Sequence, residues 1–186
     1  TLTTGTTPSG DHAEVFAEEG LPWLTPEDLR DHAVATRFLS PSGASQVRAL
    51  AAGAVLICGI GASVGKVGYA DGACSFNQQI TGIVPVAGVN SRYLYYALRA
   101  AGSQVLSRTV GNTLPILNNL RLGGVRLHLP DARRQAAIAE HLDRETAKID
   151  SLIAKAERFI ELAKERRSAL ITAAVTGQLD IEEGAA

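Results

Sequence analysis

The spacing of apolar positions changes character at Pro130. Before it, apolar residues come in short groups: 54–58 is a continuous run typical of a buried strand, and 64–70 predicts a second strand that ends at an Asp71-Gly72 turn. Segments 79–84 and 125–129 predict two more strands, and Asn90 or Ser91 is placed to cap a helix that runs to about residue 101. These short mixed elements predict an α+β domain over residues 1–130.

After Pro130 the helical period takes over. Asp131 is placed as the N-cap and Gly177 as the stop, with no glycine or proline between them. Glu145/Lys148 and Glu161/Lys164 are spaced as i,i+3 ion pairs. Apolar positions follow three-and-four spacing over about four heptads: Leu142, Ile149, Leu152, Ala156, Phe159, Ala163 and Leu170.

Such a helix would be roughly 65 to 70 Å long, more than one small domain can cover. We therefore expect residues 131–177 to form one long coiled-coil helix that pairs with another, a homodimer being the simplest arrangement, followed by a tail over 178–186.

The formal net charge of −1 hides an uneven distribution. Residues 1–31 hold seven acids and one base, whereas residues 32–130 hold eight bases and one acid, Asp71. A cationic segment of this kind favours an anionic partner such as double-stranded DNA. The alternative is that these bases pair with the acidic first 31 residues in the folded chain.

The sequence lacks the usual signatures of catalysis. The segment from Gly59 to Lys66 departs from both the Walker A and the dinucleotide-binding patterns, and a predicted strand follows it where phosphate binding needs a helix N-terminus. Ser63 beside Lys66 has the composition of a nucleophile and its base, but the glycine-rich turn already explains both residues. The four histidines lack metal-ligand spacing, and Cys58 and Cys74 suit core packing. We expect no catalytic residue, metal or cofactor in this chain.

Several segments, in this order, resemble the specificity subunit of type I restriction–modification systems. The chain opens with Gly5-Thr6-Thr7-Pro8-Ser9 and then Leu21-Pro22-Trp23-Leu24-Thr25-Pro26-Glu27-Asp28-Leu29, similar to the start of that family's target-recognition domain. The resemblance continues through Gly61-Ala62-Ser63-Val64-Gly65-Lys66, Asn77-Gln78-Gln79, Arg92-Tyr93-Leu94-Tyr95-Tyr96, Gly111-Asn112-Thr113 and Gln135-Ala136-Ala137-Ile138-Ala139, and ends at Thr172-Ala173-Ala174-Val175-Thr176-Gly177. Each motif is weak alone, but their order over about 170 residues is specific.

The resemblance implies a DNA-recognition subunit that is not itself an enzyme. Methyltransferase and restriction subunits would be its partners, and S-adenosylmethionine, Mg and ATP would belong to them. Family members commonly have two recognition domains and two spacer helices that lie antiparallel, so this chain resembles a half subunit. It departs from the family at Arg134-Gln135, where Glu-Gln is usual, a change that affects contacts at the helix start. The absence of methionine leads us to expect that Thr1 is not the translational start.

The candidate DNA contacts divide by chemistry. Lys66 and Arg108, in or next to glycine-bearing loops, are predicted to contact phosphate. Gln78 and Asn112 carry the amide that pairs with adenine, and Arg37 or Arg48 carries the fork that matches guanine. Asn77 and Thr113 adjoin two of these residues, although capping a turn explains Asn77 and Gln78 equally well.

Two other classes of function compete with this interpretation: a nucleotide-dependent enzyme and a coiled-coil scaffold without a nucleic-acid role. No apolar run reaches the roughly 18 residues that a membrane span needs, and no secretory signal opens the printed chain. We expect a cytoplasmic protein.

Overall fold

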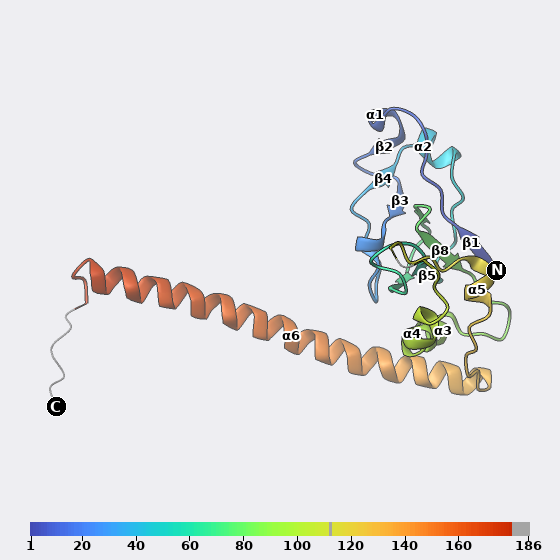
Figure 1. Ribbon diagram of the computed structural model, residues 1–186. Helices are drawn as coiled ribbons and strands as arrows, with labels where there is room; N and C mark the ends of the chain where they lie inside the picture. Colours follow the sequence, from blue (N-terminus) through green and yellow to red (C-terminus); the bar gives the residue numbers. More distant parts are fainter. Residues whose placement is uncertain (112, 180–186) are drawn as a thin grey trace. The chain divides into compact units, whose positions relative to one another are not determined.

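The computed structural model describes residues 1–111 and 113–179, and two four-stranded sheets form the frame of its first part (Figure 1). The first sheet has the order β1-β8-β5-β6, with every neighbouring pair antiparallel. The second has the order β2-β4-β3-β7 and ends in a parallel pair, β3 with β7. The strands are β1 Leu2–Thr4, β2 Phe16–Ala17, β3 Leu21–Leu24, β4 Phe38–Leu39, β5 Ala54–Cys58, β6 Val67–Ala70, β7 Ser75–Phe76 and β8 Ile80–Ile83.

Strand β5 is buried on both faces, which explains its continuous apolar run. Leu56 and Cys58 point into a cluster that includes Leu24 and Phe76 of the second sheet. Val55 and Ile57 point to the opposite face, into a cluster formed with the helices. The first sheet is therefore the middle layer of the domain.

Three helices supply the layer on that other face: α3 Ser91–Ala100, α4 Gly102–Leu106 and α5 Asn119–Gly123. Asn90 caps α3 by accepting from the Tyr93 backbone N–H at 2.8 Å, as one of the two predicted caps. Two short helices, α1 His12–Val15 and α2 Pro41–Ser45, and a 3-10 turn over Pro26–Asp28 complete the first 50 residues.

Two predicted strands differ in the structure. The strand expected over 64–70 begins at Val67, because the preceding residues form the turn that leads into it. The strand expected over 125–129 is absent, and side chains satisfy its backbone instead. The Arg126 N–H donates to Gln104 Oε1 at 2.7 Å, and the Tyr93 hydroxyl donates to the His128 carbonyl at 2.8 Å. Val125 and Leu127 still pack against the helical cluster, so the alternation reflects an extended segment rather than a strand.

The chain divides into two compact units, Thr1–Ala139 and Glu140–Ala186. Helix α6, Ala132–Val175, ends the first unit and makes up most of the second. Asp131 accepts from the Arg134 backbone N–H at 2.9 Å, and Gly177 has φ +72°, so both predicted ends of this helix are confirmed. The ion pairs Glu145–Lys148 and Glu161–Lys164 form at 2.8 and 2.7 Å. No helix among the described residues is long and apolar enough to cross a membrane.

Candidate nucleic-acid interface

Three loops that are distant in sequence are joined by backbone hydrogen bonds. The Gly59 N–H donates to the Gln79 carbonyl at 2.7 Å, the Leu117 N–H to the Gly59 carbonyl at 2.8 Å, and the Gly61 N–H to the Pro115 carbonyl at 3.0 Å. Gly61 has φ +90°, a conformation that favours glycine at this crossing point. The glycine-rich loop thus holds the loop of Gln78 and the segment 110–119 on either side of itself.

An amide-lined hollow of about 390 Å³ lies where these loops meet. We call it the amide hollow; its polar lining consists of Thr4, Gln78, Gln79, Thr81, Asn118 and Asn119. Asn119 is fixed, because its Oδ1 accepts from the Thr81 hydroxyl at 3.0 Å and its Nδ2 donates to Thr4 Oγ1 at 3.1 Å. Asn118 caps α5 by accepting from the Arg121 N–H at 3.0 Å. The hollow therefore has a rigid polar wall.

The opening segment of the chain closes one side of the Gln78 loop. A Cβ on Gly5 would lie 2.2 Å from the Asn77 carbonyl, so only glycine allows this close approach. The Thr6 N–H donates to the Phe76 carbonyl at 2.9 Å, and the Thr7 hydroxyl donates to Gln78 Oε1. Gln78 remains exposed, and no described residue accepts from its side-chain NH₂ group. Its amide is positioned yet keeps donor capacity.

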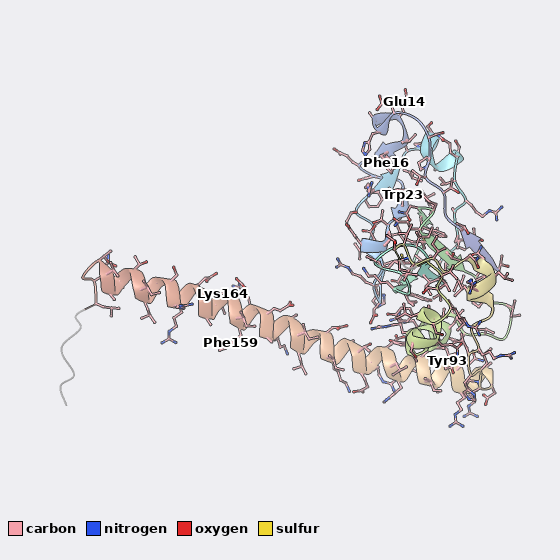
Figure 2. All side chains as sticks on the ribbon, in the orientation of Figure 1. Glu14, Phe16, Trp23, Tyr93, Phe159 and Lys164 are labelled. Carbon is pink, nitrogen blue, oxygen red and sulfur yellow. The ribbon has the colours of Figure 1, made fainter. Side chains whose placement is uncertain are left out.

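A second hollow, which we call the arginine hollow, contains Arg37. It shares Gln79 and Ile60 with the amide hollow and is also lined by Thr25, Ser63 and Asn77. The Arg37 guanidinium lies over the Trp23 ring, 5.0 Å from its centroid, and 6.0 Å from that of Phe16. Figure 2 labels these two aromatic residues, whose rings pack edge to face. Trp23 is buried and donates from Nε1 to the Thr6 carbonyl at 3.1 Å. A fixed aromatic surface therefore orients the Arg37 fork.

Asn77 is a turn cap in this structure. Its Oδ1 accepts from the Gln79 N–H and its Nδ2 donates to Gln79 Oε1, both at 3.1 Å, and it is only 8% exposed. A DNA contact by Asn77 stays a prediction, and the buried cap gives the residue a structural task in addition.

Lys66 reaches toward the acidic opening segment. Its Nζ donates to the Pro26 carbonyl at 2.8 Å and to the Glu27 carbonyl at 3.3 Å, while the residue remains exposed. It lines a third hollow with Arg30, Asp31 and Arg99. The phosphate contact of Lys66 stays a prediction, and its ammonium group already donates to two backbone carbonyls.

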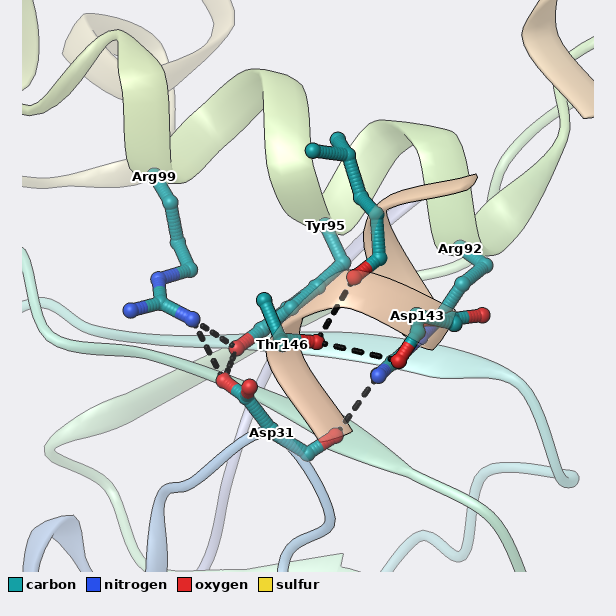
Figure 3. Close-up of polar contacts among 7 residues, drawn as sticks. Asp31, Arg92, Tyr95, Arg99, Asp143 and Thr146 are labelled. Carbon is teal, nitrogen blue, oxygen red and sulfur yellow. Dashed lines mark hydrogen bonds and ion pairs between the residues drawn. The ribbon is translucent and has the colours of Figure 1, made fainter. Parts of the chain in front are cut away.

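Asp31 organises two further bases of the cationic segment (Figure 3). Its carboxylate pairs with Arg99 at 2.5 Å and accepts from the Tyr95 hydroxyl, and its carbonyl accepts from Arg92 at 2.6 Å. Lys66, Arg92 and Arg99 thus contact residues 26–31, although the bonds from Lys66 and from Arg92 Nη1 reach backbone carbonyls rather than the acidic side chains of the pairing alternative. Of these contacts, the one between Arg99 and Asp31 joins a base to a carboxylate of that segment.

The remaining candidates lie outside the two polar hollows. Arg48 is exposed on the segment after α2, and Arg108 follows α4, its guanidinium packed against Gly124, where a Cβ would lie 2.7 Å from Nη1. Neither lines the amide hollow or the arginine hollow. Thr113 is exposed in a bend, and Asn112 lies outside the described residues.

Cys58 and Cys74 are both buried in the core. Burial raises the pKa of the Cys74 thiol from 9.0 to about 11. Burial also raises the pKa of Cys58, opposed by its hydrogen bond to the Ile60 carbonyl and by the charge of Lys66. The described part of the chain contains no group of three or more potential metal ligands. Strand β6, rather than a helix, follows the Gly59–Lys66 loop.

Of the residues that line the amide hollow, only Gln78 was predicted as a DNA contact from the sequence, and those missed include Asn118, Asn119 and Leu120. Two adjacent amides in a segment without carboxylates were a usable signal. Their proximity to Gln78 depends on the loop pairing, which no sequence spacing reveals.

The fold and these loops define an α+β recognition domain that leads into a long helix. Residues 1–161 match the family model for the type I restriction modification DNA specificity domain. The chain therefore belongs to this family.

Curated relatives carry the same description. The chain is 36% identical over 94 residues to the type I restriction enzyme EcoBI specificity subunit of Escherichia coli, an alignment that covers 50% of this chain and 20% of that protein. It is 28% identical over 148 residues to the EcoDI specificity subunit of Escherichia coli, which covers 78% and 32%. The chain thus spans about a third or less of these two relatives.

Solved structures share the fold. One chain, from work on complex assembly and conformational transition of the type I R-M system, superposes with a TM-score of 0.69 at 23% identity, covering 92% of this chain and 42% of that one. The HsdS subunit from Thermoanaerobacter tengcongensis gives a TM-score of 0.60 at 21% identity, covering 81% and 36%.

Proposed function

We propose that this chain binds a specific sequence of double-stranded DNA and directs the methyltransferase and restriction subunits of a type I system to it. Residues 1–130 recognise the DNA, residues 131–177 form the spacer helix, and residues 178–186 are a tail. S-adenosylmethionine, Mg and ATP chemistry belongs to the partner subunits, and the complex acts on DNA in the cytoplasm. The family match and its specificity-subunit relatives support this assignment.

The observation that carries the proposal is the pairing of the two polar hollows. Amide groups suited to adenine line one hollow, and an oriented arginine suited to guanine lines the other. No carboxylate occurs between Asp71 and Asp131, so the loops of Gln78 and of segment 110–119 introduce no negative charge against phosphate.

Binding of the full chain to duplex DNA at 50 and 200 mM salt tests the proposal. A sequence-specific DNA protein should lose affinity steeply over this range because binding releases counterions. Affinity that is absent or does not change with salt would favour a scaffold without a nucleic-acid role. ATP turnover or stoichiometric S-adenosylmethionine binding by the isolated chain would favour an enzyme.

Two substitutions separate contacts to phosphate, which position the DNA, from contacts to bases, which specify its sequence. Lys66→Ala should weaken binding to all sequences alike and flatten the salt dependence, whereas Gln78→Ala should cost roughly 1 to 3 kcal/mol at its own base pair. Because Lys66 also holds the 26–27 carbonyls, its variant must first show an unchanged thermal unfolding midpoint. Equal losses on specific and random DNA for both variants would contradict these roles.

We also propose that two copies of the chain pair through α6 as an antiparallel coiled coil. Residues 147–172 are exposed along the helix, and this stretch includes Leu152 at 64%, Phe159 at 72% and Leu170 at 50%. Phe159 is labelled on this helix in Figure 2. A continuous apolar stripe of this length needs cover from another chain. We favour a second copy of this chain as the partner, because small residues of the stripe would face large ones of the same stripe in the other copy.

That complementarity lies in the order of small and large residues. An antiparallel register that sets Ala156 opposite Phe159 also sets Ala163 opposite Leu152 and Leu142 opposite Ala173. In this register the two remaining positions of the stripe, Ile149 and Leu170, face Arg166 and Glu145, so the complementarity is confined to the middle of the helix and the pair Leu142–Ala173. A parallel pair would instead set each alanine against its own copy and leave voids next to crowded phenylalanines. Two recognition domains at opposite ends would then bind two inverted half-sites separated by a non-specific gap.

Sedimentation tests the pairing. Leu152→Asp with Phe159→Asp should give a monomer, because two unpaired charges in the interface cost several kcal/mol. Ala154→Asp, on the opposite side of the helix, is the control and should remain dimeric. A wild-type chain that is monomeric at tens of micromolar would contradict the proposal.

A further inference from the structure

Leu120 lies at the edge of the amide hollow and is 86% exposed. It occupies the first turn of α5, directly after Asn118 and Asn119. We infer that Leu120 is a specificity-determining residue that contacts the 5-methyl group of a thymine in the bound DNA. The inference rests on the proposed DNA-recognition function and adds an apolar contact to its polar ones.

The position of Leu120 is fixed by its neighbours. Leu122, two residues later, is 5% exposed and anchors α5 in the helical core, so Leu120 points away from that core. The Asn118 cap and the bonds from Asn119 to Thr81 and Thr4 hold the start of the same helix. A leucine held outward in this way presents its methyl groups beside the hollow.

The surroundings favour a base over another protein. Gln78, with free donor capacity, and exposed Asn118 line the same hollow as Leu120. An amide pairs with the N6 and N7 groups of adenine in the major groove, and the thymine of that base pair displays its methyl group in the same groove. An A·T pair therefore presents hydrogen-bonding groups on adenine and a methyl group on thymine. The side-chain amides at the hollow suit the first, and Leu120 suits the second.

The experiment uses the full chain and a duplex selected from a random pool for highest affinity. Each thymine of that duplex is replaced in turn by deoxyuridine, which removes only the methyl group. Leu120→Ala should weaken binding to the selected duplex about fourfold to tenfold, and one deoxyuridine should weaken the wild type about fourfold. At that position the variant should show no further loss, because the contact is already gone.

Leu129→Ala is the matched control, since Leu129 is 49% exposed and lines neither polar hollow. It should bind like the wild type. Unchanged affinity for Leu120→Ala would overturn the inference. An equal loss for this variant on every deoxyuridine duplex would also overturn it and indicate a wedge between bases. A wild type that selects no sequence at all would instead overturn the proposed function, and the inference with it.

Discussion

At the scale of single residues, the proposed DNA interface combines side chains that the fold already holds in place. Arg37 lies over Trp23, and the indole in turn donates to the Thr6 carbonyl. An arginine that is stacked before DNA arrives loses less side-chain freedom on binding. Arg37 and Arg48 are both exposed, and the contacts of Arg37 with the Trp23 and Phe16 rings make it the better candidate for contact with guanine.

Arg37→Lys should therefore cost roughly 1 to 3 kcal/mol of specific binding while non-specific binding stays nearly constant, because the charge is kept but the fork is lost. Arg48→Lys should leave the specific affinity unchanged. Fluorescence anisotropy measures the specific affinity with the selected duplex and the non-specific affinity with a random duplex. The opposite ranking of these two variants would transfer the guanine contact to Arg48.

Cys74 predicts a pH dependence of stability. Its folded pKa of about 11 lies above the ordinary 9.0, so the unfolded chain releases this proton first as the pH rises. The contribution to stability is complete below pH 9 and is lost between pH 9 and about 11. Urea unfolding at pH 8 and 10.5 should show a larger fall for the wild type than for Cys74→Ala, which removes this titration. A smaller fall in the wild type would contradict the assignment.

At the scale of elements, the first turn of α6 is built into the recognition unit by Gln135. This side chain is 3% exposed; its Oε1 accepts from the Asn90 N–H at 2.8 Å and its Nε2 donates to the Pro130 carbonyl at 2.7 Å. It therefore joins the start of α6 to the cap of α3. The neighbouring Arg134 side chain is exposed, which explains how a departure from the usual family residue is tolerated.

Gln135→Ala should lower the free energy of unfolding by about 1 to 3 kcal/mol, because buried backbone groups lose their partners. Arg134→Glu should instead raise it by about 0.3 to 1 kcal/mol, since an acid near a helix N-terminus is favourable. Chemical denaturation at one fixed protein concentration compares the two. Unchanged or increased stability of Gln135→Ala would contradict this role, since alanine has the higher helix propensity and only the lost hydrogen bonds lower the stability.

The sequence predicted those elements whose pattern is local. Strand β5, the cap of α3 and both ends of α6 follow from apolar runs, caps and glycine, and the structure confirms them. The second sheet was not predicted, because β2 and β4 have two residues each and depend on pairing for their stability. The amide hollow was beyond prediction for a related reason: its wall comes from loops that meet through the bonds of Gly59 and Gly61.

At the scale of the whole molecule, the proposed pairing of α6 would determine how far apart the DNA-binding surfaces of the two copies lie. In the proposed antiparallel register, residue 157 lies almost opposite its own copy, whereas the two copies of residue 168 are about 30 Å apart along the axis. A parallel pair would bring both positions close to their copies. The distance between the two copies of residue 168, compared with that at residue 157, therefore distinguishes an antiparallel from a parallel pair.

Spin labels on Glu157→Cys and Ser168→Cys, each with Cys58 and Cys74 replaced by alanine, measure these separations. Distances should be short at residue 157 and roughly 30 Å or more at residue 168. Short distances at both positions would contradict the antiparallel pairing but not the dimer itself.

Strand β1 has a consequence for synthesis. Leu2 pairs with Ile83, and β3 pairs with β7, so the residues of β1 and β3 are synthesised well before the partners with which they form sheets. Closing such long loops is slow compared with forming a helix, whose contacts are all within a few residues. The unit Thr1–Ala139 should therefore be the slow-folding part of the chain, and the segment around β1 should need protection from aggregation until Ile83 has emerged.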